Sequence, residues 1–262
     1  MRIALFSDIH GNSFALDAVL ADIEAQGGVD AHWVLGDLVK LGPDPAGVLE
    51  RLAALDNALF VCGNTDRYIV TGTMPYPGPE DVAADLSLLP RYEVIARQTG
   101  WTQGIVTAAG YLGWLEELPV EQRLTLPDGT RLLGVHASPG HHSGPGFHPE
   151  LSRAQMEGLL RGCEADLVCV GHTHCPMDVR LGPARLVNLG SLSFHLPEHL
   201  YASYVLLEAD AAGYGVRHRR VDYDRGAAIE MVRRVRFPNG QFLIDGLNGR
   251  HKPTWQFPPD GG

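Results

Sequence analysis

Five short apolar runs recur along the chain, and each is bounded by glycine or polar residues. They span residues 3–6, 32–35, 59–62, 132–135 and 167–170. Short apolar runs between turn residues are typical of β-strands that are covered on both faces. The pattern therefore predicts an α/β protein with several buried strands.

Apolar residues at helical spacing fill the two gaps between the first three runs. Asn12 or Ser13 should cap the first helix, and Asp44-Pro45 should open the second, with proline in its first turn. The order strand, helix, strand, helix, strand predicts parallel strands joined by right-handed crossovers. The expected core positions of the two helices are Leu16, Val19, Leu20, Ile23, Val48, Leu49, Leu52 and Leu55.

Residues 67–118 break this alternation and form an insertion that begins close to Asn64. The insertion either adds packing surface or forms a cap over a site beside Asn64. A proline-rich loop at 74–79 precedes three stretches that we expect to be helical, over 80–89, 91–99 and 101–118.

The second half of the chain is predicted to consist mostly of strands. A hairpin is expected where Pro127-Asp128-Gly129 separates two strands, 123–126 and 130–135. A helix near 224–235 should follow the last strand. We expect one domain over residues 1–236, with the insertion inside it, and a tail over 237–262 that lies on the surface. The later strands should form a second sheet packed on the first, near 166–170, 184–189, 202–208 and 215–222.

The composition of the chain indicates where in the cell the protein is expected and which partners it is expected to bind. No apolar run approaches the length of a membrane span, and the N-terminus lacks the pattern of a signal peptide, so we expect a cytoplasmic protein without membrane contact. The formal net charge of −10 disfavours binding of long nucleic acids. The four cysteines form no CxxC pair, so most are expected to be buried thiols.

Seven polar residues follow the apolar runs and have side chains that bind metals. Because loops at the carboxyl ends of strands converge in α/β sheets, residues far apart in the chain can meet there. Imidazole, carboxylate and amide ligands without a thiolate suit Mn, Fe, Zn, Ni or Co better than Ca. Two ions that share Asp37 as a bridge would each have about four protein ligands. The seven residues are Asp8, His10, Asp37, Asn64, His136, His172 and His174.

The five phrases that carry these residues resemble the motifs of the calcineurin-like metallophosphoesterase superfamily, D-x-H, GD, GN-x-(D/E), H and GH-x-H. Within it, the chain is similar to the bacterial and archaeal small phosphodiesterases that include dinucleoside-tetraphosphate hydrolases. The similarity extends over roughly the first two hundred residues and includes the loop Asn188-Leu189-Gly190-Ser191.

This resemblance implies a four-layer αββα sandwich of two mixed sheets flanked by helices, and two divalent transition-metal ions, with Mn expected first. It assigns Asp8, His10 and His174 to one ion. The other ion would bind Asn64, His136 and His172, and Asp37 would bridge the two. Asn64 and His172 would also contact a phosphate oxygen. The implied reaction is hydrolysis of phosphodiesters or dinucleoside polyphosphates, both small phosphorylated substrates, by a hydroxide that bridges the ions.

The chain departs from the family pattern at Thr65, where many relatives carry a histidine thought to protonate the leaving group. A hydroxyl of normal acidity is a poor general acid, which favours substrates whose leaving group needs little protonation. Asp66 could substitute as the acid. Arg67 either grips a second phosphate or forms a surface ion pair of little consequence. Further candidates for substrate contact are His141, His142, His148 and His195.

Two alternatives to this reading remain open. The chain could be a phosphomonoesterase or protein phosphatase on the same metal centre. It could also be a non-catalytic metal-binding scaffold, since some relatives of this kind have lost ligands. All seven positions keep ligating side chains here, which favours the enzyme.

Overall fold

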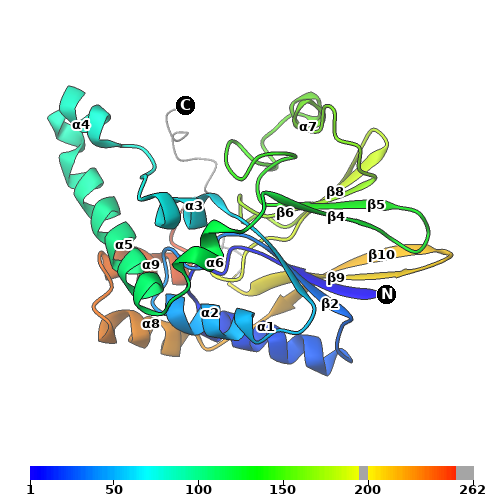
Figure 1. Ribbon diagram of the computed structural model, residues 1–262, viewed down its shortest axis with the longest axis horizontal. Helices are drawn as coiled ribbons and strands as arrows, with labels where there is room; N and C mark the ends of the chain where they lie inside the picture. The colour runs from blue at the N-terminus through cyan, green and yellow to red at the C-terminus, as the bar shows by residue number, and fades with distance from the viewer. Residues whose placement is uncertain (195–199, 252–262) are drawn as a thin grey trace.

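The computed structural model describes residues 1–194 and 200–251, and these form two sheets packed face to face between helices (Figure 1). Helices α1 (Ser13–Ala25) and α2 (Pro45–Ala53) cover one sheet, and α7 (Arg153–Leu159) covers the other. Three clusters of buried apolar side chains occupy the interfaces between these layers. The predicted four-layer αββα sandwich is confirmed.

The first sheet has the strand order β10-β9-β1-β2-β3. Strands β1, β2 and β3 are parallel to one another, as the alternating pattern predicted, and Asn12 and Asp44 cap the helices between them. The bounds of its strands are β1 (Arg2–Phe6), β2 (Ala31–Leu35), β3 (Ala58–Val61), β9 (Ala202–Asp210) and β10 (Gly213–Val221).

The second sheet has the order β4-β5-β6-β8-β7. Strands β5, β6 and β8 are parallel, while β4 and β7 run antiparallel at the edges. The hairpin around Asp128 is confirmed as the pair β4 and β5. The bounds of its strands are β4 (Glu121–Thr125), β5 (Arg131–Val135), β6 (Leu167–Val170), β7 (Met177–Leu181) and β8 (Ala184–Asn188).

The last two strands belong to the first sheet, so their predicted place in the second sheet was wrong. Strand β9 pairs antiparallel with β1, and β10 pairs with β9. Strand β1 pairs with β2 along one edge, and β9 pairs with the other edge, where the backbone N–H and C=O groups of β1 also need partners. The prediction failed because sequence order does not determine which sheet a later strand joins.

The insertion is helical, but its elements differ from those predicted. A single helix continues through Gly100, where the sequence predicted a break. A Cβ added at Gly100 would meet nothing within 4 Å, so no close contact requires glycine at this position. This helix packs against α2 and α3, and Gln103 Nε2 donates to Ile69 O at 2.7 Å. The elements are α3 (Asn64–Thr71), α4 (Pro79–Ala84), a 3₁₀ turn (Leu86–Leu88), α5 (Leu89–Ala108) and α6 (Leu112–Glu116).

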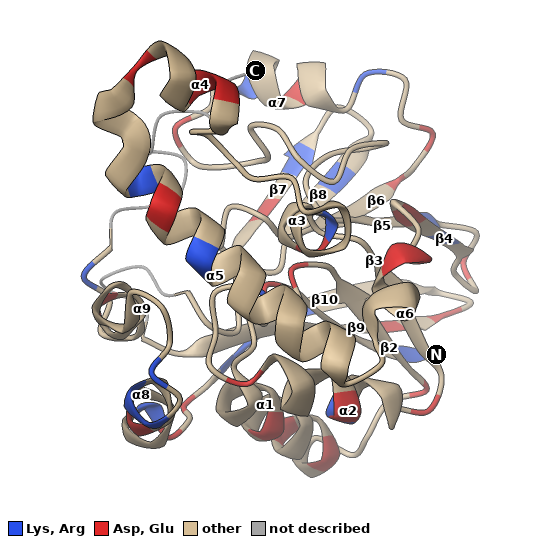
Figure 2. Cartoon of the chain, turned by 60° about the vertical axis from the view of Figure 1, so that its left-hand side comes forward, with Lys and Arg blue, Asp and Glu red and all other residues tan. Residues whose placement is uncertain are grey.

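Up to residue 251, the C-terminal region is a packed pair of helices rather than a surface tail, and residues 252–262 of the predicted tail lie outside the described residues. The predicted helix α8 (Arg225–Arg234) is confirmed, and α9 (Gly240–Leu247) packs against it. Phe237, Leu243 and Leu247 are buried at this contact, which the proline and glycine content of the segment concealed. Basic side chains gather on α8, whereas α1 and α4 carry acidic ones (Figure 2). Among the described helices, none has the length and apolar character to cross a membrane.

Candidate metal centre

All seven candidate ligands lie beyond the carboxyl ends of parallel strands, at the same edge of the sandwich. Asp8 and His10 follow β1, Asp37 follows β2, and Asn64 follows β3 as the first residue of α3. From the second sheet, His136 follows β5, and His172 and His174 follow β6. The packing of the two sheets therefore brings side chains from both to one point, as predicted.

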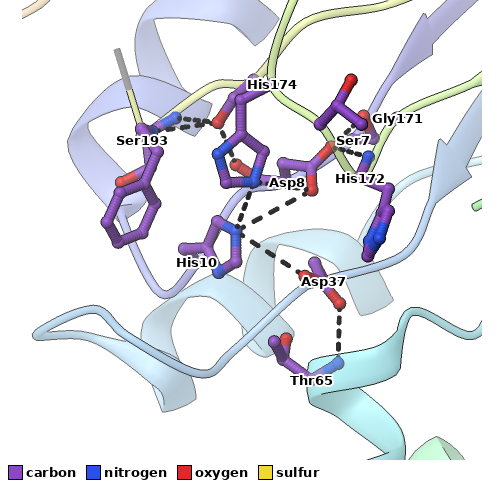
Figure 3. Close-up of polar contacts among 12 residues, drawn as sticks. Ser7, Asp8, His10, Asp37, Thr65, Gly171, His172, His174 and Ser193 are labelled. Atoms are coloured by element: carbon purple, nitrogen blue, oxygen red, sulfur yellow. Dashed lines mark hydrogen bonds and ion pairs between the residues drawn. The ribbon is translucent and has the colours of Figure 1, made fainter. Parts of the chain in front are cut away.

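Asp8, His10 and His174 form the first group of potential ligands. Their ligand atoms all lie within 4.8 Å of one another. His174 Nε2 is 3.2 Å from Asp8 Oδ1 and 3.3 Å from His10 Nε2. Figure 3 shows the three side chains pointing toward a common centre. The structure thus brings together the set that the family resemblance assigned to one ion.

Asn64, His136 and His172 form the second group. Asn64 Oδ1 is 3.2 Å from His136 Nε2 and 3.0 Å from His172 Nδ1. Asp37 lies between the two groups, because its Oδ2 is 3.7 Å from His10 Nε2 and its Oδ1 is 3.4 Å from His136 Nε2. One carboxylate thus faces an imidazole of each group.

Backbone carbonyls fix the orientation of three of the imidazoles. His10 Nδ1 lies 2.9 Å from Lys40 O, His136 Nδ1 lies 2.7 Å from Leu35 O, and His172 Nε2 lies 2.8 Å from Gly144 O. A carbonyl only accepts hydrogen bonds, so each of these nitrogens carries the proton. In His10 and His172 the other ring nitrogen then has its lone pair free toward the centre, as a metal ligand requires. Burial lowers the pKa of His136, but Asp37 outweighs it and raises that pKa to about 10, so His136 would release a proton on binding a metal.

Asp8 provides the test of whether the site fits a cation. Its Oδ2 accepts hydrogen bonds from Ser7 Oγ at 2.6 Å and from His172 N at 3.0 Å. Its Oδ1 is buried and accepts no hydrogen bond from residues 1–194 and 200–251, although it faces His174. An unpaired buried carboxylate oxygen is costly, and a metal ion would satisfy it. The donor set of imidazole, carboxylate and amide therefore fits divalent transition metals.

Burial and neighbouring charges set the protonation of these groups. Burial, aided by a neighbouring imidazole, lowers the pKa of His10 and of His172 to about 4. Burial raises the pKa of Asp37, but His136 and His10 outweigh it and hold that pKa far below its usual range. Near pH 7, Asp37 is thus a carboxylate and both histidines are neutral, which are the forms that bind metals.

The backbone of the ligands is strained. Asp8, His10, Asp37, His172 and His174 all have φ between 49° and 69°, in the left-handed region that non-glycine residues rarely adopt. Such strain concentrates at functional sites, where the surrounding structure enforces it. Gly63 shows how tight the centre is, because a Cβ there would lie 2.1 Å from Asp37 Oδ1.

The contacts of Asp66 are all to backbone amides, and its predicted role as an acid on the substrate stays a prediction. Its Oδ2 accepts from Asp37 N at 2.8 Å and from Gly63 N at 3.0 Å, and its Oδ1 accepts from Leu38 N at 2.8 Å. The side chain has 0% exposure. Asp66 is therefore a positioning residue that ties the loop after β2 to the loop after β3.

Thr65 and Arg67 flank Asp66 on α3. Thr65 N donates to Asp37 Oδ1 at 2.9 Å, while the Thr65 hydroxyl is buried and has no hydrogen-bond partner in the described ranges. Arg67 is exposed, and no acidic partner is recorded for it within residues 1–194 and 200–251. That Arg67 grips a second phosphate stays a prediction. His195 lies outside the described residues.

Several residues that hold the centre were missed by the sequence reasoning. Ser191 Oγ donates to Asp8 O at 2.9 Å and accepts from Phe194 N at 2.9 Å. The Phe194 ring meets His10 edge-on at 4.7 Å and stacks on His174 at 5.5 Å, between ring centroids. Serine and phenylalanine carry no sequence signal of metal chemistry, although Ser191 belongs to the loop that resembles the family.

Comparison with known proteins identifies the family. The model of the calcineurin-like phosphoesterase superfamily domain matches residues 1–212, so the chain belongs to this superfamily. The predicted class of enzyme, a phosphoester hydrolase, is thereby confirmed. The crystal structure of a metallophosphoesterase from Sphaerobacter thermophilus matches with a TM-score of 0.71 and 26% identity, covering 96% of this chain and 99% of that one.

Two sequence relatives differ in how much they share with the chain. An uncharacterized protein of Methanocaldococcus jannaschii is 29% identical over 253 residues, 90% of this chain and 93% of that protein. A symmetrical bis(5′-nucleosyl)-tetraphosphatase of Pectobacterium carotovorum is 29% identical over 143 residues, 52% of this chain. The match covers only 43% of that tetraphosphatase.

The contacts of Asp66 predict that Asp66→Asn weakens the metal centre without touching an ion. An amide group would turn its own N–H toward one of the three backbone donors, which costs about 1–3 kcal/mol of stability. We expect metal affinity to fall about tenfold, measured by chelator competition. Asp85→Asn is the matched control, because Asp85 is exposed and caps only a 3₁₀ turn. Unchanged affinity and stability in Asp66→Asn would contradict the positioning role.

The two groups of ligands predict that the histidines of Gly171-His172-Thr173-His174 serve different ions. His174→Ala should lower the occupancy of the site at Asp8 and His10, and His172→Ala that of the site at Asn64 and His136. Anomalous scattering from Mn-loaded crystals of each variant measures the two occupancies separately. Loss of the same ion in both variants would overturn this partition.

Proposed function

We propose that the protein is a dinuclear metal-dependent hydrolase of phosphodiesters or dinucleoside polyphosphates. The observation that carries the proposal is the carboxylate of Asp37, which faces His10 in one group of ligands and His136 in the other at 3.7 and 3.4 Å. The unpaired Asp8 Oδ1 supports an ion in the first group. Membership of the phosphoesterase superfamily supports the reaction class.

Asp8, His10, His174 and Asp37 would hold one ion, and Asn64, His136, His172 and Asp37 the other. Such ions, when bound, supply a water of lowered pKa and positive charge next to the phosphoryl oxygens. Among the ions that suit this donor set, we propose Mn as the physiological one.

The side chains of the chain itself orient the substrate. His172 is held by Gly144 O through Nε2, so its ring cannot turn away from Asn64. We propose that both side chains also contact a phosphate oxygen: Asn64 donates its amide N–H to it, and the ring of His172, whose N–H is bound to Gly144 O, lies against it without donating. A donor that is fixed before the substrate binds costs little reorganisation during the reaction.

The small substrates proposed here fit a protein with a net charge of −10, since its acidic surface repels long polyanions. The name of the tetraphosphatase relative supports a nucleotide substrate, although the match spans less than half of that protein. We also infer a reducing location such as the cytoplasm, which the free thiols Cys62, Cys163, Cys169 and Cys175 support.

The reaction proposed here predicts a steep dependence of rate on the acidity of the leaving group. The Thr65 hydroxyl is buried, so it cannot donate a proton to a departing oxygen. Diesters of nitrophenol should therefore be hydrolysed far faster than those of phenol, and those of phenol faster than alkyl diesters. The measurement is kcat/KM across such a series with the Mn-loaded protein.

Thr65→Val is the matched control for this series, because it removes only an unpaired hydroxyl and should leave the slope unchanged. A flat dependence in the wild-type protein would show that another acid protonates the leaving group. No hydrolysis of any diester, together with rapid hydrolysis of phosphomonoesters, would reject the proposed substrate class.

A further inference from the structure

The loop of residues 137–146, which follows His136, is folded back on itself at its start and contacts His172 at its far end. At one end, Ala137 N and Ser138 N donate to His141 O at 3.4 and 3.2 Å, and His141 N donates to Ser138 O at 2.8 Å. These bonds fold the turn back onto the residue that follows His136. His142 comes directly after this turn.

At the other end, Gly144 O accepts from His172 Nε2 at 2.8 Å. Gly146 packs so closely that a Cβ there would lie 2.8 Å from His172 Cδ2. His142 therefore lies in a short span held between two of the candidate metal ligands. It is half-buried, whereas His141, Ser143 and Gly144 are exposed, so its side chain is directed toward the protein.

Arg67 approaches the same place from α3. It lies three residues after Asn64, so both side chains project from the same face of the helix. The pKa of His142 is lowered first by burial and then by the charges of His136 and Arg67, while Asp37 opposes them. The geometry agrees, because Asn64 Oδ1 is 3.0 Å from His172 Nδ1 and His172 Nε2 is 2.8 Å from Gly144 O, two residues after His142. These contacts link the start of α3, which carries Arg67, to the span that carries His142.

We propose that Arg67 and His142 form a subsite for a second phosphate, next to the group of Asn64, His136 and His172. The guanidinium of Arg67 would bind two phosphate oxygens in parallel, and the imidazole N–H of His142 would bind a third. The proposal rests on the proposed function and names its substrate class, because the bond that is broken then joins two phosphates.

A phosphoanhydride also suits the buried hydroxyl of Thr65. In its hydrolysis, the oxygen of water bonds to one phosphorus, and the bond from that phosphorus to the bridging oxygen breaks. The electron pair stays on the departing phosphate, and the water releases one proton to the solvent and keeps the other as the new P–OH group. A phosphate leaves as a stable anion without a general acid. Arg67 would balance the charge that develops on it.

Binding of two small anions to the Mn-loaded protein tests the subsite without turnover. Methylenediphosphonate carries two phosphoryl groups and resists hydrolysis, whereas methylphosphonate carries one. Isothermal titration calorimetry gives both dissociation constants and their ratio. We expect the wild-type protein to prefer the diphosphonate, and Arg67→Ala and His142→Ala each to lower this preference about tenfold.

Conservative and control variants make the result specific. His142→Gln keeps a hydrogen-bond donor and should recover part of the preference. Arg153→Ala and His32→Ala remove a guanidinium and an imidazole outside this subsite, on α7 and on β2, and should keep the wild-type ratio.

Either of two results would overturn the subsite. One is a wild-type protein that binds both anions equally, and the other is a preference for the diphosphonate that survives both alanine substitutions. Hydrolysis of bis(p-nitrophenyl) phosphate by the wild-type protein is measured in parallel. If that hydrolysis is absent, the proposed function fails, while the binding ratio still decides the subsite.

Discussion

The carboxylate of Asp37 connects the two halves of the molecule, because it faces His10 from the first sheet's loops and His136 from the second sheet. This contact exists only if the two sheets pack with their parallel strands ending at the same edge. Three backbone amides bound by Asp66 hold the loop of Asp37 against the loop after β3. The geometry of the metal centre therefore depends directly on how the two sheets pack.

Bringing the ligands together at this edge costs conformational free energy. Five of the seven candidate ligands adopt left-handed φ angles, and one buried oxygen of Asp8 has no hydrogen bond to the part of the chain that the structure describes. Both features are unfavourable in a protein without ions, and bound cations would offset the second. We therefore expect the centre to be prepared by the fold and stabilised by its metals. Phe194 stacks on His174 and Ser191 donates a hydrogen bond to Asp8 O, so both residues help to hold the first group of ligands in place.

The sequence predicted the parts of the structure that local patterns determine. Strands β1, β2 and β3 and their helices follow from apolar spacing and from caps at Asn12 and Asp44. The candidate ligands follow from residue types placed after those strands. Pairing between distant segments was not predictable, so β9 was assigned to the wrong sheet. The role of Asp66 was also missed, because a carboxylate that binds buried amides and one that donates a proton look the same in sequence.

The central claim is that Asp37 bridges two ions, and electron paramagnetic resonance of the Mn-loaded protein tests it most directly. Two Mn ions that share a carboxylate ligand are coupled magnetically. We expect the wild-type protein with two equivalents of Mn to give the spectrum of a coupled pair, and Asp37→Ala to give at most the six-line signal of isolated ions. A wild-type protein that shows only isolated Mn at full loading would contradict the account.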